Sequence, residues 1–354
     1  MKNIRFLFTA LVFFFSCSQA ESQKNNFETS SVVPTKPIPN YNPTSSKING
    51  VNFVAPPRAT DQSWTADLQQ INSGWVSLVP YAFSRIDEPS VNYEPDRQYW
   101  GESLAGVKAT IKQAHAAGLK VMIKPQVWMQ RGWIGDFDLQ AEEDWQIWEA
   151  DYEKYILHFV KLGAEENVEM ICIGTEYKKA VIKRPEFWEK LAIDIRKIYK
   201  GKLTYCANWD DYTDVKFWKS LDYVGISGYF PLSQAKTPSV SALEKAWKPI
   251  KEQLKAFSNQ QQKPILFTEY GYRSMDQAAW RSWEMENQER PINNLAQAHA
   301  YEALYKTFWN ESWFAGGFAW KWYSSFRRMD SKNNHDWTPQ NKKAQVVMKV
   351  FYGK

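Results

Sequence analysis

Short apolar runs alternate with longer amphipathic stretches along the chain from about residue 48 to its end. Runs of β-branched and aromatic residues are typical of strands buried on both faces, and apolar residues spaced by three and four are typical of the helices that cover them. Strands are predicted at residues 51–55, 75–81, 120–125, 169–174, 203–208, 223–227, 265–268 and 316–320. Helices are predicted at residues 62–72, 103–117, 144–165, 186–199, 214–219, 241–257, 293–310 and 341–351.

This alternation predicts an α/β fold, a (β/α)8 TIM barrel formed as a single domain by residues 48–354. A doubly wound open sheet is the structural alternative. It would give fewer strands and usually a glycine-rich first turn, whereas the chain has neither a G-x-G-x-x-G motif nor a P-loop. The pattern therefore favours the barrel.

The first 47 residues lack the βα pattern and predict an exported protein. Lys2 and Arg5 precede an apolar run at 6–15 that suits a secretory signal and is too short to span a membrane. Cys17 follows in a context that resembles the lipobox of bacterial lipoproteins, and plain secretion with cleavage after Ala20 is the alternative. We expect a signal and lipobox segment at 1–17, a flexible tether at 18–47, and membrane attachment only through a lipid on Cys17, at the outer membrane or cell surface.

Composition and charge narrow the possible partners. The net charge of +5 is spread without basic runs, so we expect no nucleic acid as a partner. Three cysteines and four histidines show no metal-ligand spacing, and we expect neither a metal nor a cofactor, and a monomer. Cys172 and Cys206 fall on neighbouring predicted strands, where we expect buried thiols, with a disulfide as the alternative.

Two glutamates follow buried strands at one rim of the predicted barrel. The fourth and the seventh strands both end in Thr-Glu-Tyr, which places Glu176 and Glu269 where active sites of such barrels lie. A carboxylate directly after a buried run is costly unless it is paired, hydrogen-bonded or exposed in a cleft. Two facing carboxyl groups suit glycoside hydrolysis, in which one protonates the leaving oxygen while the other attacks or activates water. The alternative is that each glutamate only pairs with a basic residue at the rim.

The positions of Glu176 and Glu269 resemble those of glycoside hydrolase clan A. Four short motifs look like glycoside hydrolase family 113, whose members are typically β-mannanases: Gly-Val-Asn-Phe at 50–53, Ile-Gly-Thr-Glu at 173–176, Thr-Glu-Tyr-Gly at 268–271 and Ala-Trp-Lys-Trp at 319–322. The resemblance covers about residues 48–354.

The resemblance implies that Glu176 is the general acid/base, that Glu269 is the nucleophile and that Tyr229 hydrogen-bonds Glu269. It also implies that Trp320 lies beneath the sugar being cleaved. Many clan members have Asn where this chain has Thr175, which leaves the contact to the sugar 2-hydroxyl open.

Other residues at strand ends are positional candidates for binding sugar. The aromatic candidates are Trp128, Trp133, Trp209 and Trp322, and the polar candidates are Arg58, Lys124 and Asn208. Loop packing or a solvated rim charge is the alternative for each of them. Six tryptophans fall in helical segments and are expected to pack against the barrel instead: Trp145, Trp148, Trp188, Trp218, Trp247 and Trp309.

The resemblance and the paired glutamates together predict a retaining glycoside hydrolase that cleaves a β-linked polysaccharide or oligosaccharide, β-1,4-mannan above all. Both an endo-β-1,4-mannanase and a related β-mannosidase fit. The alternatives are a non-catalytic surface glycan-binding lipoprotein and a β-glycosidase of another specificity on the same scaffold. The carboxylate pair counts against the first alternative, because binding alone needs no such pair.

Overall fold

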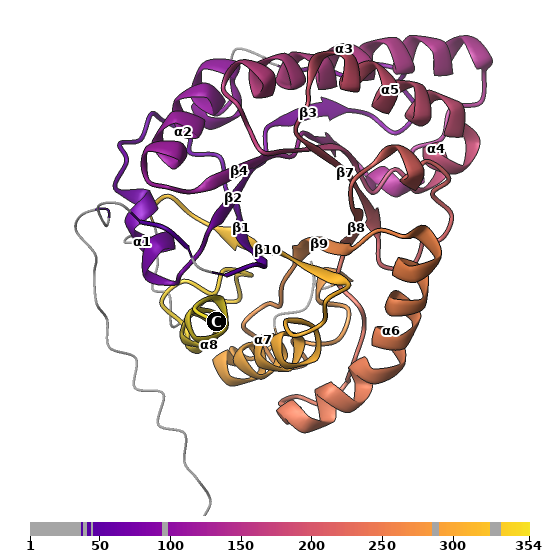
Figure 1. The fold of residues 1–354 in the computed structure, drawn as a ribbon. Coiled ribbons are helices and arrows are strands. Elements are labelled where there is room, and N and C mark those ends of the chain that lie inside the picture. Colours follow the sequence, from indigo (N-terminus) through magenta and orange to yellow (C-terminus); the bar gives the residue numbers. More distant parts are fainter. Residues whose placement is uncertain (1–36, 38–40, 44, 94–97, 285–289, 326–333) are drawn as a thin grey trace, which may run out of the picture.

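Eight parallel strands close into a barrel in the computed structural model of the chain (Figure 1). The structure describes residues 37, 41–43, 45–93, 98–284, 290–325 and 334–354. The strand order around the barrel is β1-β10-β9-β8-β7-β6-β4-β2. The barrel strands are β1 (Ile48–Phe53), β2 (Trp75–Leu78), β4 (Lys120–Ile123), β6 (Met170–Thr175), β7 (Lys202–Asn208), β8 (Val224–Ser227), β9 (Ile265–Tyr270) and β10 (Phe314–Trp322). The predicted (β/α)8 barrel is confirmed, and the open sheet is excluded.

Helices surround the barrel on the outside (Figure 1). They are α1 (Trp64–Gln70), α2 (Leu104–Ala116), α3 (Glu142–Glu165), α4 (Lys178–Lys183), α5 (Pro185–Ile198), α6 (Val240–Gln261), α7 (Asn294–Phe308) and α8 (Lys343–Tyr352). The N-termini of α2, α6 and α7 are capped by Ser103, Ser239 and Asn293, whose side chains accept a backbone N–H of the first turn. The predicted helix at 214–219 is wrong, since only a short 3-10 turn forms there, at Trp218–Ser220. Helix α4 is absent from the sequence-based prediction.

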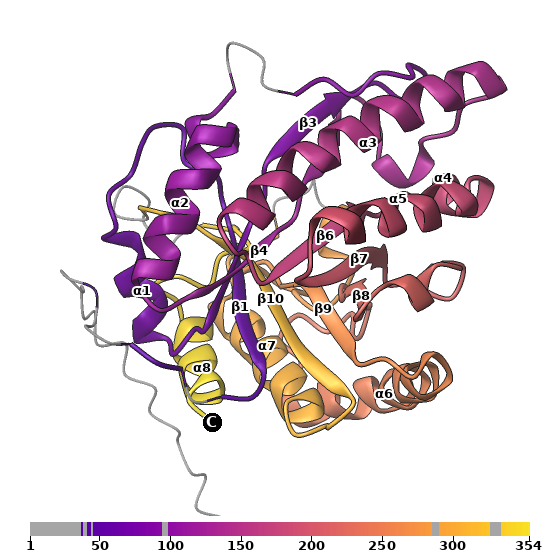
Figure 2. The ribbon, with the colours of Figure 1, turned by 45° about the horizontal axis from the view of Figure 1, so that its top comes forward.

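A second, two-stranded sheet extends two of the predicted strands beyond the barrel. It pairs β3 (Tyr81–Ser84) with β5 (Gln126–Met129) in parallel, and it lies beside α3 in Figure 1 and in Figure 2. Pro80 precedes β3 and Pro125 precedes β5. Proline has no N–H to donate to a ladder, so each proline interrupts its strand. The residues at these two breaks, among them Lys124, therefore lie at the mouth of the barrel.

The aromatic residues of the helices form much of the core between helices and barrel. All six tryptophans predicted to pack there are buried, and Trp148, Trp188, Trp218 and Trp247 are almost completely inaccessible. The hydrocarbon surface of such rings contributes strongly to the free energy of folding. Cys172 and Cys206 are both buried and both free, as expected.

The end of the segment predicted as a tether contacts the barrel. The Tyr41 hydroxyl donates to the Ser73 carbonyl at 2.8 Å, and the Lys47 ammonium donates to the Glu311 carbonyl at 2.6 Å. The signal segment, Cys17 and most of the tether lie outside the described residues, so export, lipidation and the segment boundaries stay predictions. Among the helices that the structure describes, none is long and apolar enough to cross a membrane.

Candidate active site

Glu269 is buried at the end of β9 and accepts three hydrogen bonds. Oε1 accepts the Lys124 ammonium and the Gln126 amide, the latter at 2.6 Å, and Oε2 accepts the Tyr229 hydroxyl at 2.9 Å. A buried carboxylate is tolerated when donors of this kind compensate its charge. These donors come from two segments of the mouth, the tripeptide 124–126 and the end of β8, and they hold the carboxylate in one orientation. The predicted hydrogen bond from Tyr229 is present.

Lys124 is the cation that balances Glu269. Its side chain has no exposed surface, and its ammonium lies 5.9 Å from the centre of the Trp320 ring. Burial by itself lowers the pKa of Lys124, but the charge of Glu269, the nearby Cys206 and Cys172 and the hydrogen bond to Glu269 together raise that pKa by more, so the net direction is upward. The structure thus corrects the expected role of Lys124: a buried ammonium that is already bonded to Glu269 does not reach out to sugar hydroxyls.

Glu176 follows β6 and has a strained backbone. Its φ of 57° lies in the left-handed region, which costs a residue with a side chain roughly 1–2 kcal/mol. The strand register shifts between Cys172 and Thr175, just before this residue, and the Glu176 N–H is held by the Cys206 carbonyl at 2.7 Å. Such irregularities re-aim a side chain. The carboxyl Oε2 accepts the indole N–H of Trp133 at 2.9 Å.

The two glutamates have different electrostatic environments. Burial raises the pKa of Glu176 above its ordinary value, and the negative charge of Glu269 raises it further. Hydrogen bonds from Ser227 and Trp133 and the charge of Lys124 offset part of this rise. Glu269, in contrast, is bonded directly to a cation. This asymmetry suits one proton donor and one ionised carboxylate at the same mouth.

Trp320 and Trp322 differ in position although both lie on β10. Trp320 is partly exposed and lines a cavity at the mouth. Trp322 is only 1% exposed and belongs to the main core, so the expectation that it lines the sugar site is wrong. The register between β1 and β10 shifts between Asn52 and Phe53, where Asn52 faces Trp320 and Phe53 faces Trp322. This irregularity breaks the regular alternation of side chains and allows Trp322 to turn into the core.

The remaining sequence candidates are exposed or contact other residues. Trp128 is 52% exposed on β5, and its ring meets Phe83 edge-on. Trp209 packs against Phe230 and Trp283, with ring centres about 6 Å apart. The Asn208 amide donates to Asp210 at 2.9 Å. Arg58 is exposed in the loop after β1. The structure joins none of these four by a described contact to Glu176 or Glu269.

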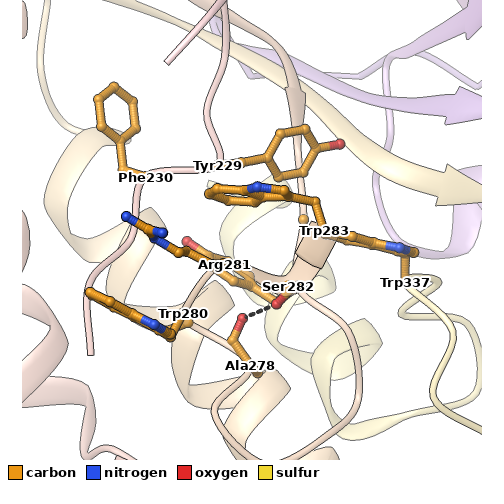
Figure 3. Close-up of a pocket in the computed structure, with 11 residues that line it drawn as sticks. Tyr229, Phe230, Ala278, Trp280, Arg281, Ser282, Trp283 and Trp337 are labelled. Carbon is orange, nitrogen blue, oxygen red and sulfur yellow. Dashed lines mark hydrogen bonds between the residues drawn. The ribbon is translucent and has the colours of Figure 1, made fainter. Parts of the chain in front are cut away.

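The loops after β9 and β10 meet beside Tyr229. Trp280, Trp283 and Trp337 line a small aromatic pocket there together with Tyr229 (Figure 3). The Trp337 ring meets the Tyr229 ring edge-on at 5.3 Å. Hydrogen bonds join the two loops, among them the one from the Arg273 guanidinium to the His335 carbonyl at 2.9 Å. The described parts of these loops therefore form one wall of the mouth.

Sequence reasoning missed several residues of the site. Gln126 follows the break at Pro125 and was hidden inside a stretch predicted to be loop, yet it donates to Glu269. The sequence predicts Trp133 only as an aromatic wall of the sugar site, whereas its indole N–H donates to Glu176. Tyr81 and Glu102 line the cavity beside Trp320. Gln126 is a polar residue immediately after a strand-breaking proline, and this position is the sequence feature that could have indicated a place in the site.

Comparisons with known proteins agree with this geometry. The complex structure of a GH113 β-1,4-mannanase aligns with a TM-score of 0.76 at 25% identity, covering 87% of this chain and 99% of that chain. A GH113 β-mannanase from Alicyclobacillus acidocaldarius aligns with a TM-score of 0.76 at 24% identity, covering 87% and 98%. A β-glucuronidase from Ruminococcus gnavus shares the fold alone, with a TM-score of 0.58 at 14% identity, covering 86% of this chain and 50% of that chain.

The family model gives the assignment. A comparison with curated protein sequences finds no match. The model for Glycoside Hydrolase Family 113, however, matches residues 57–342, which include both glutamates and almost the whole barrel. The chain therefore belongs to glycoside hydrolase family 113 and is a glycoside hydrolase.

Proposed function

We propose that the protein hydrolyses β-1,4-mannan with retention of configuration, with Glu269 as nucleophile and Glu176 as acid/base. The observation that carries the proposal is the unequal environment of the two carboxyl groups. Glu269 is bonded to a buried ammonium, and Glu176 has a raised pKa. Retaining glycosidases need such a pair, with one group ionised and the other protonated.

The chemistry proceeds in two displacements. In the first, Glu176 gives its proton to the glycosidic oxygen while a Glu269 oxygen attacks the anomeric carbon, which forms a glycosyl-enzyme and releases the leaving sugar. In the second, Glu176 takes a proton from water, and the resulting hydroxide attacks the anomeric carbon and frees Glu269. Lys124, Gln126 and Tyr229 orient the nucleophile by the bonds described above.

Mannan is the proposed substrate because two of the aligned structures are described as β-mannanases, one of them as a β-1,4-mannanase. The partly exposed Trp320 ring, whose centre lies 5.9 Å from the ammonium that binds Glu269, supports a sugar substrate, since indole faces pack against the C–H faces of pyranose rings. Incubation with β-1,4-mannan should release reducing sugar, and NMR should detect the β-anomer of the product first. Initial release of the α-anomer, or cleavage of gluco- or xylo-oligosaccharides with mannan untouched, would contradict the proposal.

The raised pKa of Glu176 predicts the alkaline side of the pH profile. Glu176 must carry its proton to protonate the leaving oxygen, so kcat/KM falls as pH rises through its pKa. Because burial and Glu269 raise that pKa, this fall should lie above the roughly 4.3 of an ordinary glutamate. The profile is measured with wild type and Glu176→Gln on an aryl β-mannoside with a good leaving group. The alkaline fall should vanish in Glu176→Gln and persist in the exposed control Glu88→Gln; its persistence in Glu176→Gln would refute the role.

A further inference from the structure

A buried lysine, Lys342, lies where the loops after β9 and β10 meet. It immediately precedes α8 and is only 2% exposed. Its ammonium donates to the Ser274 hydroxyl at 2.9 Å, to the Asn334 side-chain oxygen at 3.0 Å and to the Asp336 backbone carbonyl at 3.1 Å. The three N–H donors of the ammonium thus bind one acceptor of the loop after β9 and two of the loop after β10. The proposed mechanism gives this lysine no role.

The charge of Lys342 is costly to bury. All three of its acceptors are neutral, and among the described residues no carboxylate forms an ion pair with it. The Asp336 carboxylate binds the Tyr323 hydroxyl at 2.9 Å instead, and Lys321 lies 3.5 Å from it. Burial lowers the pKa of Lys342 to about 8, although the charge of Asp336 acts in the opposite direction. An apolar side chain would avoid this cost, and titratable groups in such environments are concentrated at functional sites.

The acceptors of Lys342 are also hydrogen-bonded to one another. The Ser274 hydroxyl donates to the Asn334 carbonyl at 2.6 Å, the Asp336 N–H donates to the Asn334 side-chain oxygen at 3.0 Å, and the Ser274 hydroxyl lies 3.2 Å from the Asp336 carbonyl. Each of the three groups therefore keeps another hydrogen bond when the ammonium is removed. A variant without the ammonium is expected to fold, with the two loops less firmly joined.

The segment that Lys342 binds leads directly to the nucleophile. Asp336, whose carbonyl accepts from Lys342, immediately precedes Trp337. The Trp337 ring meets the Tyr229 ring edge-on, with the ring centres 5.3 Å apart and the planes at 69° (Figure 3). The Tyr229 hydroxyl donates to Glu269 Oε2 at 2.9 Å. Because a packed ring restricts the rotamers of its neighbour, the position of Trp337 sets where the Tyr229 hydroxyl lies.

Gln297 of α7 holds Trp337 from the other side. Its side-chain amide donates to the Trp337 carbonyl at 3.2 Å and to the Tyr272 carbonyl at 2.9 Å. Lys342 thus binds the residue before Trp337, and Gln297 binds Trp337 itself. A hydrogen bond from a charged donor is the stronger of the two kinds. Loss of Lys342 should therefore loosen Trp337, and the bond from Gln297 limits how far it moves.

We propose that Lys342 is a positioning residue for the nucleophile: by joining the loops after β9 and β10 it holds Trp337 against Tyr229 and so keeps the Tyr229 hydroxyl bonded to Glu269. The inference rests on the proposed role of Glu269 and goes beyond it. Lys342 takes no part in bond breaking and acts only through Tyr229. The effect of losing Lys342 should consequently disappear once the Tyr229 hydroxyl is gone.

A double-mutant cycle tests this role. It compares kcat/KM on 4-nitrophenyl β-mannoside for wild type, Lys342→Met, Tyr229→Phe and the double variant. Tyr229→Phe keeps the ring and should lower kcat/KM about 10- to 100-fold, the size of a lost hydrogen bond to a charged group. Lys342→Met should lower it about 10-fold in the wild-type background and less than about threefold in the Tyr229→Phe background. Lys343→Met, at the exposed neighbouring residue, is the matched control and should equal wild type.

The outcomes separate positioning from simple stabilisation of the loops. A lysine that only stabilises the loops acts equally in both backgrounds. A loss of about threefold or more in the Tyr229→Phe background, or of less than that in the wild-type background, would therefore overturn the role of Lys342. Ser274→Ala removes one acceptor and leaves the ammonium in place. It should give a smaller loss with the same dependence on Tyr229, and it decides the question if Lys342→Met does not fold.

Failure of the proposed substrate gives a different result. A wild-type protein that hydrolyses another aryl β-glycoside and leaves the mannoside untouched would contradict mannan as the substrate. The cycle is then measured on that glycoside, and the same comparison decides the role of Lys342. A wild-type protein that hydrolyses no aryl glycoside would refute both the proposed function and the inference.

Discussion

Replacing Glu269 with alanine should abolish hydrolysis, with kcat lowered on the order of 10⁴-fold or more, because no covalent intermediate can form without the carboxylate. Added azide should restore turnover of an aryl β-glycoside, since the truncated side chain leaves room for a small external nucleophile. Azide then attacks from the side where Glu269 stood, and the product should be the α-glycosyl azide. The product is identified by NMR.

The matched variant Glu176→Ala separates the two roles. Glu269 remains in this variant, so the glycosyl-enzyme still forms from substrates with good leaving groups, and azide should then give the β-glycosyl azide. If both variants give the same anomer, or if Glu269→Ala keeps near-normal turnover without azide, the assignment is wrong. Glu284→Ala, on an exposed residue paired with Arg281, serves as the unaffected control.

Replacing Lys124 with methionine should destabilise the fold by about 3–5 kcal/mol, because Glu269 would remain buried without its cation. Urea unfolding followed by fluorescence measures this loss as a lower midpoint. The double variant Lys124→Met with Glu269→Gln should recover most of the loss, since it removes both charges. Recovery is expected because the cost comes from the unpaired carboxylate and not from the missing lysine itself.

An exposed ion pair supplies the control for this effect. Lys178 lies 2.9 Å from Asp210, and both side chains are about one third exposed. Lys178→Met should cost only about 0–1 kcal/mol, because solvent screens such pairs. If Lys124→Met costs as little free energy as this, Lys124 does not compensate the buried charge of Glu269. The same conclusion follows if the double variant is as unstable as the single variant.

At the mouth of the barrel, the local sequence does not predict which side chains contact one another. Lys124 and Gln126 flank Pro125, and nothing in that tripeptide indicates that both side chains meet Glu269, which follows some 140 residues later. Trp320 and Trp322 look equivalent in sequence, and a register shift between two strands far apart in the chain separates them. The local sequence does not indicate that Glu102 is buried, because its burial depends on a turn that is hydrogen-bonded to Pro56.

The sequence by itself determined the barrel, the burial of the helical tryptophans and the placement of Glu176 and Glu269 after strands of the mouth. These features follow from periodicity and from the chemistry of single residues, which are local properties of a chain. Only the tertiary structure decided which donors bind each carboxylate and which tryptophan lines the cavity at the mouth. Those properties depend on distances between remote segments, and burial and charge act on a side chain only after the barrel has closed.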